Sequence, residues 1–266
     1  KVGYTDALVS ANTDVAANTA KKSLADGTTA GQMQYWNGSA WVIVAPTINE
    51  DATLQMIGGI PTWQGGTPPV PSVTSAGGRI WMDRNLGATQ IATSSTDAAA
   101  YGDYYQWGRG TDGHQIRLSG TTTVLSSTDN PGHGNFILVT STTGGNDNID
   151  WRSGQNDNLW QGVSGVNNPC PSGYRLPTEA EWDTEITSWS SNNAAGAFAS
   201  PLKLPVGGVR SYSNGLGLSV GYDGSCWSST VSTGRSNSVY FDSSNNSARV
   251  YDTSRAMGIA IRCLKD

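Results

Sequence analysis

Apolar and polar residues alternate along the last quarter of the chain. In residues 238–242 the apolar Val239 and Phe241 alternate with polar neighbours, so the two kinds of side chain fall on opposite faces of a strand. Residues 247–253 alternate in the same way, with the odd positions on one face. This period of two predicts antiparallel strands with one packed face and one face in water. Trp227, between two polar runs, is the expected core anchor.

Two β-hairpins are predicted in the first quarter of the chain. Residues 34–43 place aromatic and β-branched residues on both sides of Asn37-Gly38, a pair that suits a two-residue type I′ turn. Residues 53–63 repeat the arrangement around Gly58-Gly59.

The clearest helix begins at Thr178. Thr178 and Glu181 match a capping box, and Trp182, Ile186 and Trp189 recur at helical spacing, which predicts one apolar stripe packed on a core. Further expected elements are strands over 78–83, 202–206 and 257–263 and a short helix over 193–199.

Pro and Gly cluster in residues 65–76, and such clusters prevent regular strand pairing. We therefore expect a linker at 65–76, between a small β-rich N-terminal module at 1–64 and a main domain at 77–266. Residues 1–30 are rich in Ala, Asn and Thr, which favours a flexible tether over a frayed helix or a short trimeric coil. The expected fold class is α+β, loop-rich, with antiparallel strands and one or two helices.

Composition narrows the class of protein. The chain of 266 residues carries ten Trp and ten Tyr but three Phe, a profile typical of loop-rich extracellular or virion proteins. Its net charge of −5 argues against a nucleic-acid partner. No apolar run reaches the roughly 18–20 residues that cross a bilayer, so membrane insertion is not expected.

Cysteine and histidine offer few candidates for catalysis. Cys170, Cys226 and Cys263 leave at least one thiol unpaired, and their spacing matches no zinc or redox motif. Cys170 and Cys263 either form a disulfide or remain two buried thiols. His114 and His133 lie in Gly-rich loops, and we interpret them as hydrogen-bonding loop residues, because no Ser/His/Asp spacing is recognisable.

Asp and Asn are closely spaced in residues 146–150 and 156–158. Their oxygens could bind a structural Ca²⁺, but Asx-turns explain the same spacing. We favour the turns and assign no cofactor and no metal ligand.

Residues 211–254 use a narrow set of amino acids. Ser, Tyr, Asn, Gly and Asp dominate, and Lys, Glu, Gln, His, Met and Pro are absent. Antibody paratopes use a similar set, because Tyr supplies rigid contact area while Ser, Gly and Asn supply adaptable hydrogen bonds. Randomising an AAC or AAT codon only at its adenines also yields these residues and no Lys, Glu, Gln or Met. An ordinary polar strand-and-loop region has the same composition, so both interpretations stay open.

Residues 77–266 contain an ordered set of motifs, namely Trp81–Thr89, Tyr101–Gly108, Asn168–Thr178, Glu181-Trp182, Trp227–Thr230 and Ile261–Asp266. This set resembles one family, the Fibrobacter succinogenes major paralogous domain. The likeness implies a C-type lectin fold of the formylglycine-generating-enzyme subtype. The stretch 211–254 before Arg262-Cys263 is similar to the variable region of diversity-generating retroelement proteins.

The resemblance implies a fixed scaffold that displays interchangeable side chains. Trp227, Val239, Phe241, Ile259 and Ile261 would belong to the scaffold. The residues expected to face a ligand are Tyr222, Asp223, Ser225, Cys226, Ser232, Arg235, Ser238, Tyr240, Asp242, Arg249, Tyr251 and Thr253. Of these, Tyr222, Tyr240, Arg249 and Tyr251 are the expected hot spots.

The function implied is ligand or receptor binding by a retroelement-diversified surface, on a phage tail or a bacterial cell surface, and not catalysis. The partner would be a protein or glycan on a target cell, and a homotrimer is the expected assembly. A non-diversified adhesion module of the same fold is the first alternative. A copper- or oxygen-dependent oxidase of the formylglycine-generating type is the second, since a fold does not fix a function.

Overall fold

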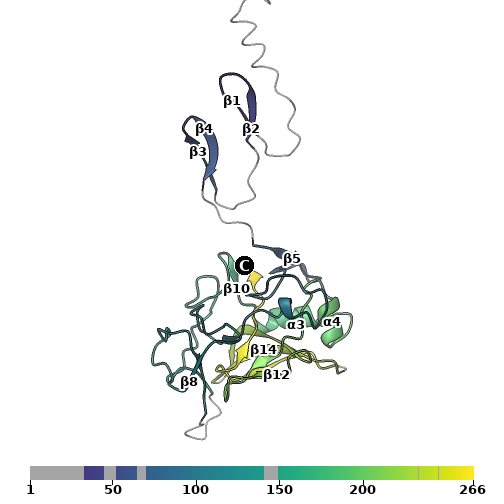
Figure 1. The fold of residues 1–266 in the computed structure, drawn as a ribbon. Coiled ribbons are helices and arrows are strands. Elements are labelled where there is room, and N and C mark those ends of the chain that lie inside the picture. The colour runs from purple at the N-terminus through teal and green to yellow at the C-terminus, as the bar shows by residue number, and fades with distance from the viewer. Residues whose placement is uncertain (1–32, 45–51, 65–69, 141–148, 233, 245) are drawn as a thin grey trace, which may run out of the picture. The chain divides into compact units, whose positions relative to one another are not determined.

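The structure is a computed structural model (Figure 1). It describes residues 33–44, 52–64, 70–140, 149–232, 234–244 and 246–266. The chain divides into two units, Lys1–Pro69 and Val70–Asp266, and each is described by itself. The tether predicted for residues 1–30 lies outside the described residues.

The first unit contains the two predicted hairpins. Strand β1 (Met33–Trp36) pairs with β2 (Trp41–Val44), and β3 (Thr53–Ile57) pairs with β4 (Ile60–Gln64). Gly58 and Gly59 form a two-residue turn with φ of +57° and +82°, the left-handed values that a type I′ turn requires.

The turn predicted for the first hairpin is wrong. Trp36 pairs with Trp41, so four residues form the loop instead of two. The reason is the side chain of Asn37, whose Oδ1 accepts hydrogen bonds from the backbone N–H groups of Ser39 and Ala40, each at 2.9 Å. This local bonding by Asn competes with the tighter turn.

The second unit is built of short strands, long loops and two α-helices, so it is α+β and loop-rich as predicted. Pairing is antiparallel except between β8 and β9. The helices are α3 (Glu179–Thr187) and α4 (Ala194–Ala199). The strands are β5 (Ser72–Thr74), β6 (Ile80–Met82), β7 (Tyr105–Gln106), β8 (Thr121–Thr122), β9 (Phe136–Ile137), β10 (Tyr174–Arg175), β11 (Val209–Arg210), β12 (Gly217–Leu218), β13 (Gly224–Ser232), β14 (Arg235–Phe241), β15 (Arg249–Thr253), β16 (Gly258–Ile259) and β17 (Leu264–Lys265).

The strands of this unit form small open sheets. Two have four strands, in the orders β10-β17-β6-β5 and β12-β11-β16-β7, one has the three strands β13-β14-β15, and β8 pairs with β9. Of the strand predicted over 257–263, only Gly258–Ile259 form a strand, β16, and β17 begins after it at Leu264 and joins the other four-stranded sheet. Neither described helix has the length and apolar character needed to span a bilayer.

The predicted linker is shorter than expected. Residues 72–74 form β5, which pairs with β6 and places Val73 opposite Trp81. Val73 packs against the core. The stabilisation from its burial outweighs the tendency of the neighbouring prolines to prevent strand pairing. The second unit accordingly begins at Val70 and not at residue 77.

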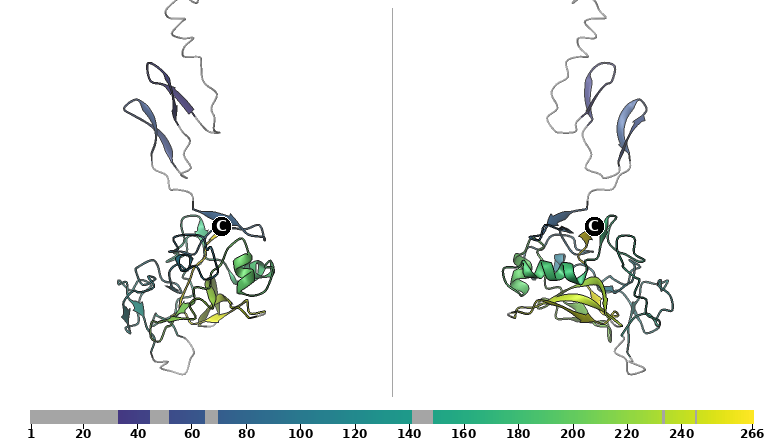
Figure 2. Two further views of the ribbon diagram at one scale, coloured as in Figure 1. Left: turned by 45° about the vertical axis from the view of Figure 1, so that its right-hand side comes forward. Right: turned by 180° about the vertical axis from the view of Figure 1, so that it is seen from behind.

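Helix α3 packs across the sheet β13-β14-β15 (Figure 2). Its capping box is present as predicted, with Glu181 N–H donating to Thr178 Oγ1 at 3.3 Å and Thr178 N–H donating to Glu181 Oε2 at 2.8 Å. Trp182, Ile186 and Trp189 are buried in one apolar cluster with Val239 and Phe241 of the sheet. Trp227 belongs to a second cluster, with Trp107, Trp151, Trp160, Ile259 and Ile261.

The strand predicted over 202–206 is wrong, although its apolar residues are buried. Leu202, Leu204 and Val206 are at most 3% exposed, yet no ladder forms there. Lys203 between them has a φ of +48°, which breaks an extended strand. The N–H groups of Leu204 and Val206 instead donate to the carbonyls of Ala197 and Ser95.

Cys170 and Cys263 form a disulfide with a Cα–Cα distance of 5.9 Å across 93 residues of sequence. The sequence left open a disulfide or two buried thiols, and the structure has the disulfide. Cys226 remains a free, buried thiol.

We predict that reducing this disulfide lowers the free energy of unfolding by about 4.5 kcal/mol, because a loop of this length adds that much chain entropy to the unfolded state. Urea unfolding with and without a phosphine reductant measures the change. The double variant Cys170→Ser/Cys263→Ser is the control and should not respond to reductant. Equal stability of the oxidised and reduced wild type would contradict the prediction.

Candidate ligand-binding surface

The register of the sheet β13-β14-β15 places three of the candidate residues on one face. Tyr240 pairs with Arg249, and Ser238 pairs with Tyr251. Directly paired residues point to the same side of an antiparallel sheet, so Tyr240, Arg249 and Tyr251 share the face that points away from α3. The alternate positions Val239 and Phe241 face α3 and are fully buried.

Tyr240, Asp242, Arg249 and Tyr251 form what we call the tyrosine cluster. The rings of Tyr240 and Tyr251 meet edge to face at 5.8 Å, and the Arg249 guanidinium lies 5.4 Å from the centre of the Tyr240 ring. Tyr240 Oη donates to Asp242 Oδ2 at 2.9 Å. Tyr251 is 37% exposed and Arg249 is exposed, so the cluster presents ordered aromatic and charged groups to solvent.

Asp223 and Tyr222 border the tyrosine cluster. Burial raises the pKa of Tyr240, and the hydrogen bond to Asp242 and the negative charge of nearby Asp223 raise it further. Tyr222 precedes Asp223 in a turn in which both N–H groups donate to Ser219 O at 3.0 Å. The Tyr222 side chain is 76% exposed, which makes it the most accessible aromatic residue of the candidate set.

Four of the residues expected to face a ligand are buried, and that prediction is wrong for them. Ser225, Cys226, Ser238 and Thr253 are 5%, 2%, 0% and 6% exposed. Cys226 pairs with Val239 and points with it toward α3. The hydroxyls of Ser238 and Thr253 bond each other at 2.8 Å within the buried part of the sheet.

Ser232 and Arg235 lie apart from the tyrosine cluster. They pair with each other at the end of the β13-β14 hairpin where the chain turns, whereas the cluster lies at the opposite end of β14. Both are half-buried. The structure therefore brings together Asp223, Tyr240, Asp242, Arg249 and Tyr251, with Tyr222 next to Asp223 in the chain, and separates Ser232 and Arg235 from them.

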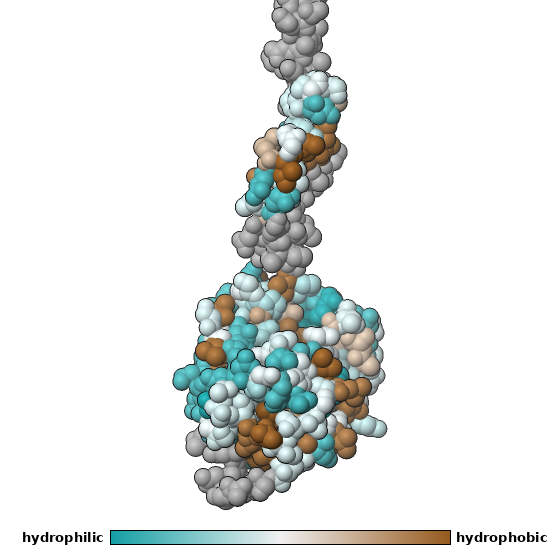
Figure 3. All heavy atoms as spheres, turned by 60° about the vertical axis from the view of Figure 1, so that its left-hand side comes forward, coloured by the Kyte–Doolittle hydropathy of each residue, from teal (hydrophilic) through white to brown (hydrophobic). Residues whose placement is uncertain are grey.

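Sequence reasoning missed three exposed apolar residues that precede Tyr222 in the chain. Leu216, Leu218 and Val220 are 64%, 45% and 40% exposed. Leu218 belongs to β12, an edge strand of its sheet. Leu216, Leu218, Val220 and Tyr222 are each two residues apart in the sequence, and this spacing was the signal that could have pointed to them. Exposed apolar side chains on this unit lie in separate patches among polar ones on the face drawn in Figure 3.

The histidines serve the structure of their loops. His114 Nε2 accepts from the backbone N–H of Gln106 at 3.0 Å, and Nδ1 lies 2.6 Å from Asp112 Oδ1. Both ring nitrogens are thus occupied, and burial lowers the pKa of His114 to about 4. His133 Nδ1 accepts from the backbone N–H of Asn135.

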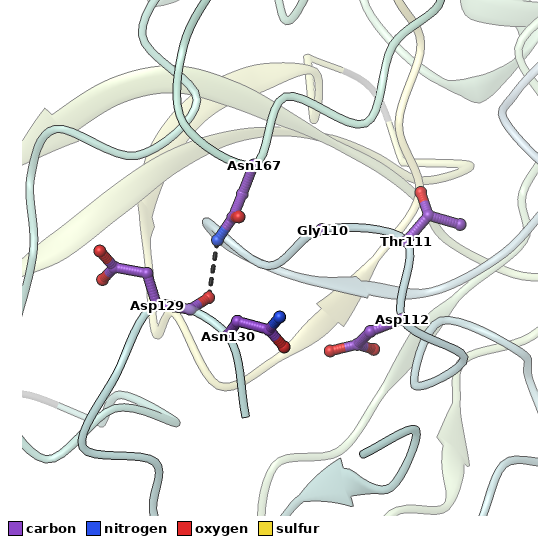
Figure 4. A pocket seen from close by; sticks show the side chains of 6 residues that line it. All are labelled: Gly110, Thr111, Asp112, Asp129, Asn130 and Asn167. Atoms are coloured by element: carbon purple, nitrogen blue, oxygen red, sulfur yellow. Dashed lines mark hydrogen bonds between the residues drawn. The ribbon is translucent and has the colours of Figure 1, made fainter. Parts of the chain in front are cut away.

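A polar pocket of about 160 Å³ lies beside Asp112 (Figure 4). Asp112 and Asn130 face each other across it, and Asn167 Nδ2 donates to the carbonyl of Asp129 at 2.7 Å. Burial opposes ionisation of Asp112, but hydrogen bonds from His114 and the charge of Arg109 hold its pKa down at about 2. Both oxygens of the Asp112 carboxylate thus already have hydrogen-bond partners, His114 at Oδ1 and Arg109 at Oδ2.

The Asp and Asn clusters behave as turns where the structure describes them. Asn156 Oδ1 accepts from Asn158 N–H, and Asp150 Oδ1 accepts from Arg152 N–H. Residues 146–148 lie outside the described residues. In the described part of the chain, no group of three His, Cys, Asp or Glu side chains is arranged to hold a metal ion.

We predict that Cys226 is unreactive in the native protein. Burial raises the pKa of its thiol to about 12, so the thiolate, which is the reactive form, is a fraction of about 10⁻⁴ at pH 8. Labelling with a disulfide reagent should modify one thiol per chain after unfolding in guanidinium and none before. Cys226→Ser is the control and should give no signal in either state. Fast labelling of folded wild type would refute the burial argument.

Several residues that are far apart in sequence contact one another around the start of α3. Arg175 bonds both Glu181 and Asp266, and Trp182 Nε1 donates to Trp227 O at 3.1 Å. Comparison with protein-family models, curated proteins and solved structures gave no match.

Proposed function

We propose that this chain is a ligand-binding protein whose C-terminal surface is diversified by a retroelement on a C-type lectin scaffold of the formylglycine-generating-enzyme subtype. The observation that supports it best is that one stretch contains both exposed and fully buried residues. Tyr222, Arg249 and Tyr251 are exposed, while Val239 and Phe241 on β14 are fully buried. Replacement of the exposed set changes the contact surface and leaves the core as it is.

The surface has the chemistry of a binding site. Tyrosine offers rigid, amphipathic contact area, and the edge-to-face pair and the Arg249 contact order these side chains before any partner arrives. Preordered side chains lose less entropy on binding. The proposed partner is a protein or glycan on a target cell, met by a phage tail or a bacterial cell surface, with the first unit serving attachment or assembly into a homotrimer.

The cysteines argue for binding over thiol-dependent oxidation. Cys170 and Cys263 are bonded to each other, and Cys226 is buried with a raised pKa. A thiol that reacts needs an accessible thiolate.

We predict a template repeat in the DNA next to the gene. It should nearly match the segment that encodes residues 211–254 and differ from it where the gene's codons correspond to adenines in the template, with a reverse-transcriptase gene nearby. Sequencing of the flanking DNA tests this. If both the repeat and the reverse-transcriptase gene are missing, the chain is instead a non-diversified adhesion module of the same fold.

We predict that the exposed positions tolerate exchange and the buried ones do not. Tyr222→Ser and Arg249→Ser should change the free energy of unfolding by less than about 0.5 kcal/mol, because surface changes seldom do more. Phe241→Ala, on the opposite face of the same sheet, should lower it by about 3–5 kcal/mol. Urea unfolding measures all three. A loss of more than about 2 kcal/mol in the first two variants would show that these side chains are part of the scaffold.

A further inference from the structure

Strand β15 leaves one edge of its sheet open. It is the last strand in the order β13-β14-β15, and it pairs with β14 along its whole length, Arg249–Thr253. In an antiparallel strand the N–H and C=O groups of every second residue point away from the neighbouring strand. Within the described residues, no other strand and no loop backbone forms hydrogen bonds with these outward groups of β15.

The opposite edge of the same sheet is closed by the protein itself. On β13, Trp227 N–H donates to Ala260 O at 3.0 Å and Ser229 N–H donates to Pro177 O at 2.8 Å. Carbonyl groups of β13 accept hydrogen bonds from indole and amide side chains. The other described edge strands of this unit have two or three residues each. Among the described strands of the unit, β15 is therefore the longest edge that the protein does not close.

Both sides of β15 are accessible to an added strand. Arg249 and Tyr251 are exposed on the face that points away from α3. Asp252 pairs with Asn237 on the other face and is exposed as well, so α3 does not cover this part of the edge. Proteins commonly protect a long edge with a proline, a bulge or a covering loop. β15 contains no proline, and its pairing with β14 runs without a shift in register.

We propose that β15 binds an extended segment of a partner protein, which joins the sheet as an added strand. The proposal rests on the proposed function, because it assigns the choice of partner to the tyrosine cluster. Hydrogen bonds between main chains supply affinity for an extended polypeptide, and side chains at alternate positions supply specificity. Arg249 and Tyr251 are such alternate positions. Their exchange changes the preferred partner sequence and keeps the main-chain bonds.

The chemistry of the edge favours a polypeptide over a glycan. An extended polypeptide presents N–H and C=O groups at the same spacing as β15, whereas a glycan has no such row of groups. On the face that points away from α3, the residue of the added strand directly opposite Arg249 lies close enough to form an ion pair. An acidic residue is therefore preferred at that position of the partner.

Short random peptides, displayed as a library and selected on the full chain, supply the probes. Each enriched peptide is synthesised again in two forms, one N-methylated at its even positions and one at its odd positions. Only every second N–H of an added strand points toward β15, so one form should bind about tenfold or more weakly and the other should bind like the parent peptide. Calorimetry measures the affinities. Failure to enrich any peptide would overturn the proposal, and the template repeat remains the separate test of the proposed function.

Substitutions on β15 assign the contact to this edge. Arg249→Ala and Tyr251→Ala should each weaken peptide binding by about tenfold, as expected of interface hot spots. Arg79→Ala is the matched control, because it removes an exposed arginine next to β6, in a different sheet, and should leave binding unchanged. Peptides that bind the two β15 variants as tightly as the wild type would overturn the assignment to β15.

The two N-methylated forms also separate this proposal from the proposed function. Peptides that depend on Arg249 and Tyr251 but lose binding equally in both forms would refute strand addition. In that case the tyrosine cluster would still be a binding surface, contacted by side chains alone.

Discussion

The second unit depends on hydrogen bonds from buried indole groups to backbone carbonyls. Trp227 Nε1 donates to Tyr105 O, Trp107 Nε1 to Ser228 O and Trp151 Nε1 to Trp107 O, at 2.7–2.9 Å. Apart from β13, β14 and β15, the described strands of this unit have two or three residues, which leaves many carbonyls outside any ladder, and a buried carbonyl must find a donor. Each tryptophan supplies that donor together with a large apolar ring, so one residue type both fills the core and fixes the loops.

This framework explains why the polar stretch 211–254 can be ordered with few apolar residues of its own. Val239 and Phe241 face α3, and Trp227 faces the second cluster, so the sheet is held from both sides near its middle. On the side away from α3, Arg249 and Tyr251 are exposed and Tyr240 is half-buried. The surface is therefore small, and its position follows from which part of the sheet the tryptophan-rich loops leave uncovered.

Local signals in the sequence predicted local structure well. The capping box at Thr178, the Gly58-Gly59 turn and the alternation around Val239 each depend on neighbours a few residues away, and each appears in the structure. The first hairpin turn and the strand at 202–206 failed for local reasons too, namely the Asn37 side chain and the left-handed Lys203.

The candidate site was predictable only in part, because exposure depends on residues far away in sequence. Alternation gives the side of the sheet on which a residue lies, but it could not exclude Cys226, because β13 is buried on both faces, with Cys226 on one and Trp227 on the other. It could not exclude Ser238 either, which shares a face with Tyr251 but is fully buried, with its hydroxyl bonded to that of Thr253. The regular spacing of apolar residues from Leu216 to Tyr222 could be recognised in the sequence, but their exposure to solvent could not be predicted from it.

The sheet β10-β17-β6-β5 has one more consequence. It contains both the first strand of the second unit and the last, and in Figures 1 and 2 it lies on the side of that unit away from β12 and β14. Entry and exit of the polypeptide are thus neighbours, as in domains that tolerate being inserted into a host protein. A polypeptide joined at either end of this unit therefore continues from the sheet β10-β17-β6-β5, and not from the sheet that carries the tyrosine cluster.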